Sequence, residues 1–238
     1  LSTYTGISIW LDYHQVFNNS VWSNGGEGIH IDSFHSTIVN NTISNNIMGI
    51  NQHSSNYITT KDNRICNNQE YGIFIENCYY NRIKNNTVGG HLTGAGMGIR
   101  FYGGPNANNI AENNNVSGNL VGITGGYPGY TLNLILNNSV WYNLHYGIHS
   151  EHGDLQNTIN NNMVVGSAYA GIILEFVNTG APLYDVISNN TVIGKNKTGN
   201  LCDNVIYVIN NTDWGVIPVP DSNWIRISEN KVQDCNRA

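Results

Sequence analysis

Charge is scarce in this chain. Asp, Glu, Lys and Arg make up 11% of its 238 residues, and the net charge is −6. The ten Lys and Arg residues are scattered and form no basic stripe, which argues against a nucleic-acid partner. Long apolar runs are lacking as well, and none approaches the roughly 18 residues that a membrane-spanning helix needs. We therefore expect no nucleic-acid binding and no membrane span.

Cysteine and leucine are also sparse. The four cysteines, Cys66, Cys78, Cys202 and Cys235, show no C-x-x-C spacing, which argues against a zinc knuckle. Cys202 and Cys235 fall in the irregular C-terminal part, where they either form a disulfide in an oxidising compartment or remain free thiols. Leucine is too rare to hold the repeating apolar places of a leucine-rich repeat, where Ile and Val stand instead.

An internal repeat dominates what is present. The dipeptide Gly-Ile recurs along the chain, and an Asn-x-[Ile/Val] triplet lies between successive copies. The triplets are 22 to 28 residues apart, with a last step of 40. Self-similarity at this period is typical of a solenoid. The Gly-Ile copies begin at Gly6, Gly28, Gly49, Gly72, Gly98, Gly122, Gly147 and Gly171, and the triplets at Asn19, Asn41, Asn63, Asn86, Asn114, Asn138, Asn162, Asn190 and Asn230.

Each period contains three short, β-branched segments separated by Gly and Asn, which favour left-handed turns. The segments are too short for helical repeats. The first carries Gly-Ile-x-[Ile/Phe/Leu], the second has Ile three residues before the Asn in most copies, and the third is the triplet. Inward and outward side chains alternate as in strands buried on one face. The repeat predicts an all-β parallel β-helix of about nine coils, a single domain over residues 1–238 with an irregular coil and cap at about 194–238.

Asparagine is abundant, with 42 copies. The Asn that opens each triplet would stack on its equivalents at one bend of successive coils. There the side-chain amides hydrogen-bond to one another and to backbone groups that the turn leaves unpaired. A disordered Asn-rich tract is the alternative, but apolar residues make up 40% of the chain and occupy fixed places in the repeat. We therefore predict an Asn ladder.

The pattern I-x-x-N-x-[IV] followed by G-I resembles the repeat of the pectin-lyase-like superfamily. It most resembles the Asn-rich helices of carbohydrate-binding and sugar-hydrolase type in archaeal and bacterial surface proteins. The resemblance runs from Gly6 to about Val232. It implies a right-handed parallel β-helix. It implies no single activity, because the superfamily includes lyases, hydrolases, epimerases, tailspikes and structural modules.

No catalytic motif of the superfamily is present in this sequence. Fragments at 211–213, 82–84 and 152–153 resemble the polygalacturonase signatures, but their order along the chain is reversed and they lie outside the Gly-Ile strands. The D-P-H motif of the alginate epimerases is absent. Candidate site residues must therefore come from the repeat itself.

The outward positions of the repeat differ sharply in chemistry. Those two and four residues after each Gly carry His, acidic, Arg and aromatic side chains, whereas the outward place of the triplet carries mainly Ser and Thr, such as Thr42 and Thr191. A purely structural solenoid has little reason for this asymmetry, so we place the candidate site on the face of the Gly-Ile strands, the Gly-Ile face. Its candidate catalytic residues are Asp32, His53, Glu76, Arg100, Tyr102, His149, Glu151 and Glu175, and Trp10, Phe74 and Tyr102 are candidates for stacking on sugar rings.

Coil spacing predicts the distances between these groups. Equivalent residues in neighbouring coils lie roughly 4.8 Å apart. Glu151 and Glu175 should then have carboxylates on the order of 5 Å apart, as in a retaining glycosidase, and Asp32 and Glu76 roughly 9 to 10 Å apart, at the upper end of the inverting range. In a uronic-acid lyase or epimerase, Arg100 would neutralise the sugar carboxylate while Tyr or His moves the proton.

A metal site is a separate hypothesis. His30, Asp32 and His53, with His35 nearby, are candidate ligands for a divalent metal ion. We expect no other cofactor.

Two functions from different classes remain open. In the first, an extracellular domain binds polysaccharide or cell-surface glycan along the Gly-Ile face and processes it as a polysaccharide lyase, glycoside hydrolase or epimerase. In the second, a non-catalytic structural or adhesive module belongs to a cell surface or fibre and self-associates. Both place the protein outside the cell, secreted or at the cell surface. The row of ionisable residues favours polysaccharide interaction and leaves catalysis undecided.

Eight Asn-x-[Ser/Thr] sequons would fit a glycoprotein. Five of them also arise because a ladder Asn is preceded by Asn and followed by Ser or Thr, so glycosylation and accident both remain open. The sequons begin at Asn18, Asn40, Asn85, Asn115, Asn137, Asn189, Asn196 and Asn210.

Overall fold

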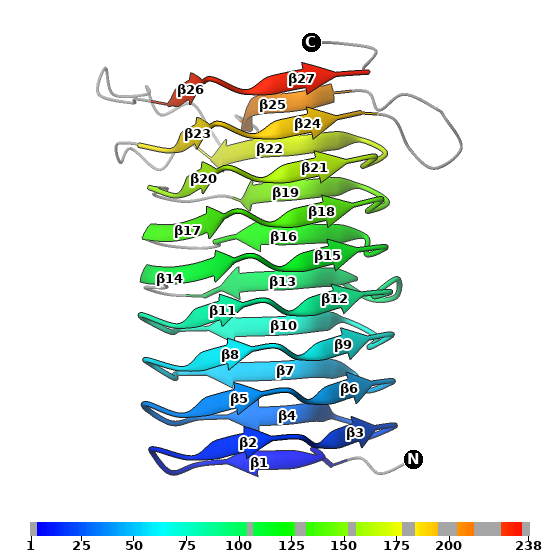
Figure 1. Cartoon of the computed structure of the whole chain (residues 1–238), viewed down its shortest axis with the longest axis vertical. Helices are drawn as coiled ribbons and strands as arrows, with labels where there is room; N and C mark the ends of the chain where they lie inside the picture. Colours follow the sequence, from blue (N-terminus) through cyan, green and yellow to red (C-terminus); the bar gives the residue numbers. More distant parts are fainter. Residues whose placement is uncertain are drawn as a thin grey trace.

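The computed structural model describes residues 4–103, 107–126, 132–151, 156–177, 184–194, 204–211 and 225–234. Strands β1 to β27 form three parallel sheets of nine strands each, which wind together into a tall coil (Figure 1). The described residues contain no helix, and hence no helix that could span a membrane. The predicted all-β, right-handed parallel β-helix is confirmed.

The three sheets correspond to the three segments of the repeat. The Gly-Ile sheet contains β1 (Ile7–Ile9), β4 (Glu27–Ile31), β7 (Met48–His53), β10 (Tyr71–Glu76), β13 (Met97–Tyr102), β16 (Val121–Gly125), β19 (Tyr146–Glu151), β22 (Ala170–Val177) and β25 (Asn204–Asn211). The middle sheet contains β2 (Gln15–Phe17), β5 (Thr37–Val39), β8 (Thr59–Lys61), β11 (Arg82–Lys84), β14 (Ala107–Glu112), β17 (Leu132–Leu136), β20 (Thr158–Asn160), β23 (Val186–Ser188) and β26 (Arg226–Ser228). The triplet sheet contains β3 (Ser20–Trp22), β6 (Thr42–Ser44), β9 (Arg64–Cys66), β12 (Thr87–Gly89), β15 (Asn115–Ser117), β18 (Ser139–Trp141), β21 (Met163–Val165), β24 (Thr191–Ile193) and β27 (Lys231–Gln233).

The expected count of about nine coils needs a small correction. The first and last strands of each sheet have a neighbour on one side only, so they form the two ends of the stack. The regular solenoid between them, from β4 to β24, has about seven turns. The count from sequence was too high because it included the first and last copies of the repeat. These copies form the ends of the stack and have a neighbouring coil on one side only.

The core consists of apolar rows, one from each sheet. Ile29 and Ile50 are directly paired on neighbouring strands of the Gly-Ile sheet, and both are fully buried. The middle sheet adds Ile38, and the triplet sheet adds Ile43 and Ile65. Because most coils place an Ile or Val at these inward positions, the rows stack along the axis, with Gln52, Thr60 and Ser150 as buried polar exceptions. Burying each such side chain contributes roughly 1.5–3 kcal/mol.

Lack of space explains the Gly of each Gly-Ile pair. A Cβ at Gly122 would lie only 2.4 Å from the carbonyl oxygen of Gly147, 2.7 Å from Val140 Cγ1 and 2.8 Å from Asn143 Nδ2. At this corner the Gly-Ile strand passes close to the next coil and to the end of the triplet strand. A side chain there would force the backbone apart, so the sequence keeps Gly at this place in the eight coils from Gly6 to Gly171.

The predicted Asn ladder is present. The backbone N–H and the side-chain Nδ2 of Asn41 both donate to Oδ1 of Asn63, at 2.9 and 3.0 Å, and Nδ2 also donates to the carbonyl oxygen of Val16 at 3.0 Å. The residue before each ladder Asn turns the chain in the left-handed region, as at Asn40 with φ 57°. The same pattern continues to Asn230.

Two further side-chain ladders were missed in the sequence. Backbone N–H groups again donate to the side chain one coil ahead. One ladder follows the triplet strands, and the other lies just before the middle strands or in their first residues. The first contains Asn24, Asn46, Asn68, His91, Asn119 and Asn143, and the second contains Asn81, Asn109, Asn133, Asn157 and Asp185.

One ionisable residue replaces Asn in each of these ladders. His91 accepts the N–H of Asn68 through Nδ1, and Asp185 accepts the N–H of Asn157 through Oδ1. Burial lowers the pKa of His91 to about 4 and raises that of Asp185 to about 7. Both side chains are therefore held in their neutral forms over part of the usual pH range.

The ladder should carry measurable stability. Asn138 is 1% exposed and bonds to Asn162 and to the carbonyl oxygen of Ala111. Asn138→Ala would leave buried backbone groups unpaired, and we expect it to lower the free energy of unfolding by about 1–3 kcal/mol. Urea unfolding measures this. Asn115→Ala, at an exposed strand position, is the control, and equal stability of the two variants would contradict the ladder.

Some expectations lie outside the described residues. Of the expected cap at about 194–238, only Gly194, β25 and the segment 225–234 are described, and Cys202, Cys235 and Asn196 are not. Cys66 and Cys78 are free cysteines. The expectation of a single domain stays a prediction.

Candidate functional site

The outward side of the Gly-Ile sheet carries three rows of side chains, one more than the sequence indicated. Strand pairing places Glu76 beside His53 and Tyr102, and Glu151 beside Glu175, as predicted. The additional row consists of the residues just before each Gly. Strict alternation would turn these residues inward, and for this reason they were missed. They include Glu27, Met48, Tyr71, Met97 and Tyr146.

Arg100 is the centre of the first cluster on this face. Its guanidinium lies 4.6 Å from the ring centre of Tyr102 and 5.7 Å from that of Tyr71, and Nη1 donates to the Tyr71 hydroxyl at 3.3 Å. Nη2 donates to Glu151 Oε2 at 3.3 Å. Burial raises the pKa of Tyr71, while the nearby Arg100 charge offsets part of this increase. Two aromatic rings and a carboxylate therefore hold the cation in one position.

The Arg100 to Glu151 contact spans two coils. Arg100 projects from β13 and Glu151 from β19, and strand β16 lies between them. The outward position of β16 paired with Arg100 is occupied by the small residue Thr124, and Gly126 follows the strand. Only small side chains at this coil leave room for the guanidinium to reach across, so the contact depends on three successive coils.

His149 and Glu175 form a second ion pair next to the first. His149 Nε2 lies 3.1 Å from Glu175 Oε2, and the His149 ring packs 4.9 Å from that of Tyr146. The His149 side chain is only 7% exposed. Burial, followed by the charges of neighbouring groups including Glu175, raises the pKa of Tyr146. Glu151 and Glu175 are thus register neighbours, as predicted, but each carboxylate contacts a different nitrogen group.

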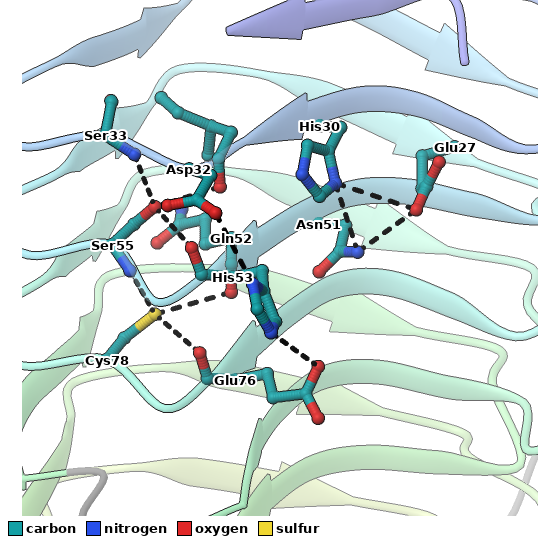
Figure 2. Close-up of polar contacts among 11 residues, drawn as sticks. Glu27, His30, Asp32, Ser33, Asn51, Gln52, His53, Ser55, Glu76 and Cys78 are labelled. Carbon is teal, nitrogen blue, oxygen red and sulfur yellow. Dashed lines mark hydrogen bonds and ion pairs between the residues drawn. The ribbon is translucent and has the colours of Figure 1, made fainter. Parts of the chain in front are cut away.

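A second cluster occupies the coils nearer the N-terminus (Figure 2). His53 lies between two acids, with Nδ1 3.7 Å from Asp32 and Nε2 3.9 Å from Glu76. These three residues share one row and span three coils. The two acids are therefore bridged by an imidazole and do not face an empty gap.

Glu27, which the sequence analysis did not select, organises the neighbouring row (Figure 2). His30 Nδ1 lies 3.7 Å from Glu27 Oε1, and Asn51 Nδ2 donates to the same oxygen at 3.2 Å. Burial acts to raise the pKa of Glu27, but hydrogen bonds from Thr5 and Asn51 outweigh it and lower that pKa. The Trp10 ring lies 5.0 Å from the His30 ring. The His30 ring therefore contacts Glu27 and Trp10 and not the His53 cluster.

The three proposed metal ligands do not converge. His30 belongs to the Glu27 contacts, whereas Asp32 and His53 lie in the next row. His35 is directed elsewhere, because it stacks between Tyr13 and Tyr57 at 5.2 and 4.8 Å on the turn after the Gly-Ile strands. Among the residues that the structure describes, no group of three or more His, Cys, Asp or Glu side chains is arranged to hold a metal ion.

The His35 stack is part of an aromatic column that the sequence analysis missed. Tyr80 continues it at 5.1 Å from Tyr57, with the planes nearly parallel. Each member occupies a left-handed turn position, as at Tyr57 with φ 60°. These aromatic residues are 22 or 23 residues apart in the sequence, and this spacing could have revealed the column.

Residues 2–146 match the family model described as periplasmic copper-binding protein (NosD). The chain belongs to the NosD family. No curated protein sequence matches it significantly. The NosD match covers the coils from the N-terminus to the start of β19 and so includes the whole His53 cluster together with Arg100.

Several solved structures share the fold of this NosD-family chain. A mutant of the periplasmic alginate epimerase AlgG matches with a TM-score of 0.70 and 16% identity, over 92% of this chain and 50% of that one. The A-module of the Azotobacter vinelandii mannuronan C-5 epimerase AlgE4 matches with 0.66 and 12%, over 94% and 60%. A GH87 α-1,3-glucanase catalytic domain in complex with tetrasaccharides matches with 0.53 and 15%, over 91% and 54%. The chain thus spans about half the length of AlgG, and these likenesses show the fold alone.

The copper in the NosD description can be tested against the donors present. Copper favours Cys, Met and His ligands. Burial raises the pKa of the Cys78 thiol to about 12, so it is not the thiolate that binds metals. Met48 and Met97 share a row but are separated by Tyr71. The described residues therefore do not fit a copper site, and we derive no step through copper.

Proposed function

We propose that this NosD-family β-helix acts outside the cytoplasm and binds polysaccharide along its Gly-Ile face, with the Arg100–Glu151 and His149–Glu175 pairs at the centre of the site. The observation that carries the proposal is the reach of Arg100 across β16 to Glu151, supported by the rings of Tyr71 and Tyr102. A purely structural solenoid has little need of a mostly buried cation on its outer face.

The shape of the face fits a linear polymer. Nine strands spaced roughly 4.8 Å apart give the Gly-Ile sheet a length of about 38 Å along the axis. Side chains that recur in rows repeat along the same direction as the residues of an extended sugar chain. Aromatic rings at Tyr71, Tyr102 and Tyr146 alternate there with acids and imidazoles, which supplies both stacking surfaces and hydrogen-bonding groups. The polysaccharide-active proteins among the structural matches support this assignment.

Charge favours a neutral polysaccharide over a polyuronate. The described outward rows carry five carboxylates but only one guanidinium, and that of Arg100 is already paired with Glu151. Neutralisation of a sugar carboxylate by Arg100 would require the Glu151 contact to break. A polyanion would also meet like charges along the whole face. The acids are Glu27, Asp32, Glu76, Glu151 and Glu175.

Glycoside hydrolysis is the second candidate function. Glu151 and Glu175 are paired across neighbouring strands, which places their backbones roughly 4.8 Å apart. This spacing is close to the about 5–5.5 Å carboxylate separation of retaining enzymes. Arg100 contacts the Glu151 carboxylate and His149 contacts that of Glu175, and these contacts would hold both carboxylates in place. A purely adhesive module remains the alternative.

A glycan panel assayed in two ways tests the proposal. We expect at least one neutral polysaccharide to bind the protein, as measured by calorimetry. Release of new reducing ends from that polysaccharide would support hydrolysis, and unsaturated products would indicate a lyase. Failure of every glycan in the panel to bind would remove the proposed function and leave the structural module.

Location has its own test. Asn40 and Asn85 are exposed, whereas the ladder residues Asn41 and Asn86 are buried. If the native protein is exported through a glycosylating pathway, its intact mass should exceed the sequence mass, with glycans at Asn40 and Asn85 and none at the ladder positions. An unmodified native mass would show that the sequons are not glycosylated and arise only from the Asn-rich repeat.

A further inference from the structure

The triplet sheet contains a groove that the proposed function does not use. A shallow cavity of about 510 Å³, largely open to solvent, lies on the outer side of β15 and β18. Pockets for small molecules typically measure roughly 300–1,000 Å³. The lining includes Asn115 and Ser117 from β15, Ser139 and Trp141 from β18, and the turn residues Gly118 and Tyr142. We call this cavity the triplet groove.

Side-chain size along the stack explains why the triplet groove forms here. The last residue of each triplet strand is paired with its equivalent in the next coil, and the pairing runs from Gly89 to Ser117 to Trp141. The turn residue that follows is Gly118 in the fifth coil and Tyr142 in the sixth. Small residues therefore precede two large aromatic residues, which leaves a hollow beside the rings of Trp141 and Tyr142.

The lining chemistry selects an uncharged, hydroxyl-rich ligand. None of the lining residues is Asp, Glu, Lys, Arg or His, so a charged ligand would lose hydration without gaining a partner. Trp141 and Tyr142 are both partly exposed and present ring surface on one side. The Asn115 amide and the Ser117 and Ser139 hydroxyls can donate to and accept from ligand hydroxyls. An apolar ring face with polar edges is the form of a neutral sugar ring.

The turn places Tyr142 beside Trp141. Tyr142 takes a left-handed conformation with φ 50°, at a turn where the neighbouring coils use Gly118 with φ 66° and Gly166 with φ 68°. Tyr residues take this conformation at other turns of the solenoid as well, such as Tyr57 with φ 60°. The conformation is therefore a general feature of these turns, and the ligand preference follows from the lining side chains.

We propose that the triplet groove is a second carbohydrate site, which binds one or a few rings of a neutral oligosaccharide independently of the Gly-Ile face. It lies on a different sheet from Arg100 and Glu151. Binding in the triplet groove can therefore be tested separately from binding on the Gly-Ile face.

Gly118→Asn is a direct way to fill the triplet groove. Asn already occupies the equivalent turn at Asn45 and Asn67, with φ 57° and 55°, so the backbone at φ 66° accepts it. A Cβ at Gly118 would have Gly90 N as its nearest heavy atom, at 3.9 Å, which leaves room for the side chain. We expect the variant to melt like the wild type and to bind its neutral tetrasaccharide at least about tenfold more weakly.

The measurement is calorimetric titration of unglycosylated protein with neutral gluco-, manno- and galacto-tetrasaccharides, with trigalacturonate as the charged comparison. Trp141→Ala should reduce affinity as Gly118→Asn does. Trp22→Ala, which removes the same ring from the same row in the first coil, should not. Unchanged binding by Gly118→Asn would overturn the proposal, as would failure of all neutral tetrasaccharides to bind. Glu151→Gln should leave this binding intact, which separates the triplet groove from the Gly-Ile face.

Discussion

Glu151→Gln and Glu175→Gln should each lower turnover of a cleaved polysaccharide by about 10²-fold or more, while changing its affinity little. Gln keeps the volume and most hydrogen bonds of Glu but cannot act as a general acid, base or nucleophile, and such roles contribute roughly 10²–10⁴-fold. The contacts with Arg100 and His149 hold both carboxylates in place. Reducing-end assays measure turnover, and calorimetry on the same preparations measures affinity.

Thr42→Ala and Thr191→Ala are matched controls, because both residues lie on the triplet sheet and outside the triplet groove. Loss of activity in these controls as large as in the Gln variants would show that the functional face is wrongly assigned. In a pure binding module only affinity should change, and Trp10→Ala and Tyr102→Ala should matter as much as the acids.

Arg100→Ala needs a stability measurement beside the activity assay. The repeat places Arg100 and His149 at outward positions, but their side chains are only 11% and 7% exposed. Removing the Arg100 cation would leave the Glu151 carboxylate without its partner in a partly buried place, which is destabilising. The double variant Arg100→Ala with Glu151→Gln removes both charges and separates the loss of stability from the loss of function.

Asp185→Asn should raise the free energy of unfolding at pH 8 by a few kcal/mol and should flatten its dependence on pH. Asp185 is 2% exposed, with Oδ1 2.7 Å from the Asn157 nitrogen. Burial raises its pKa from 3.8 to about 7. The native state therefore binds this proton more tightly than the unfolded chain. The resulting stabilisation is complete below about pH 4 and is lost as pH rises through about 7.

Asn cannot ionise, and it matches the residues that occupy the rest of this ladder, such as Asn133 and Asn157. Urea unfolding at several pH values between 4 and 8 measures the effect. Asp62→Asn, at an exposed turn, is the matched control. Parallel profiles for the wild type and Asp185→Asn would show that Asp185 is not the titrating group.

Much of the fold could be predicted from the sequence because the coils of a solenoid are held together by the same kinds of contact. Stacked Ile and Val rows and the Asn ladder need the same residue at the same place in each turn, so they appear as a period. The two missed ladders were also encoded, since Asn46 and Asn68 follow ladder residues by five and Asn81 and Asn109 precede them by five. They were overlooked because Ser, Ile, His or Asp interrupt each series.

The site was less readable, because its contacts join coils instead of repeating in them. Strand register correctly placed Glu151 beside Glu175. It could not show that Arg100 crosses to Glu151, because that reach depends on small residues such as Thr124 in the intervening coil. The row containing Tyr71 was missed because the chain departs from strict alternation at the Gly. The triplet groove likewise arises from side-chain sizes compared between coils.

A crystal structure with a bound oligosaccharide from the glycan panel tests the central claim most directly. We predict that the sugar chain lies across β13, β16 and β19, stacks on Tyr102, and has hydroxyls within hydrogen-bond distance of Arg100 and Glu151. A sugar chain found only in the triplet groove, or only on the aromatic column of Tyr13, His35, Tyr57 and Tyr80, would contradict it.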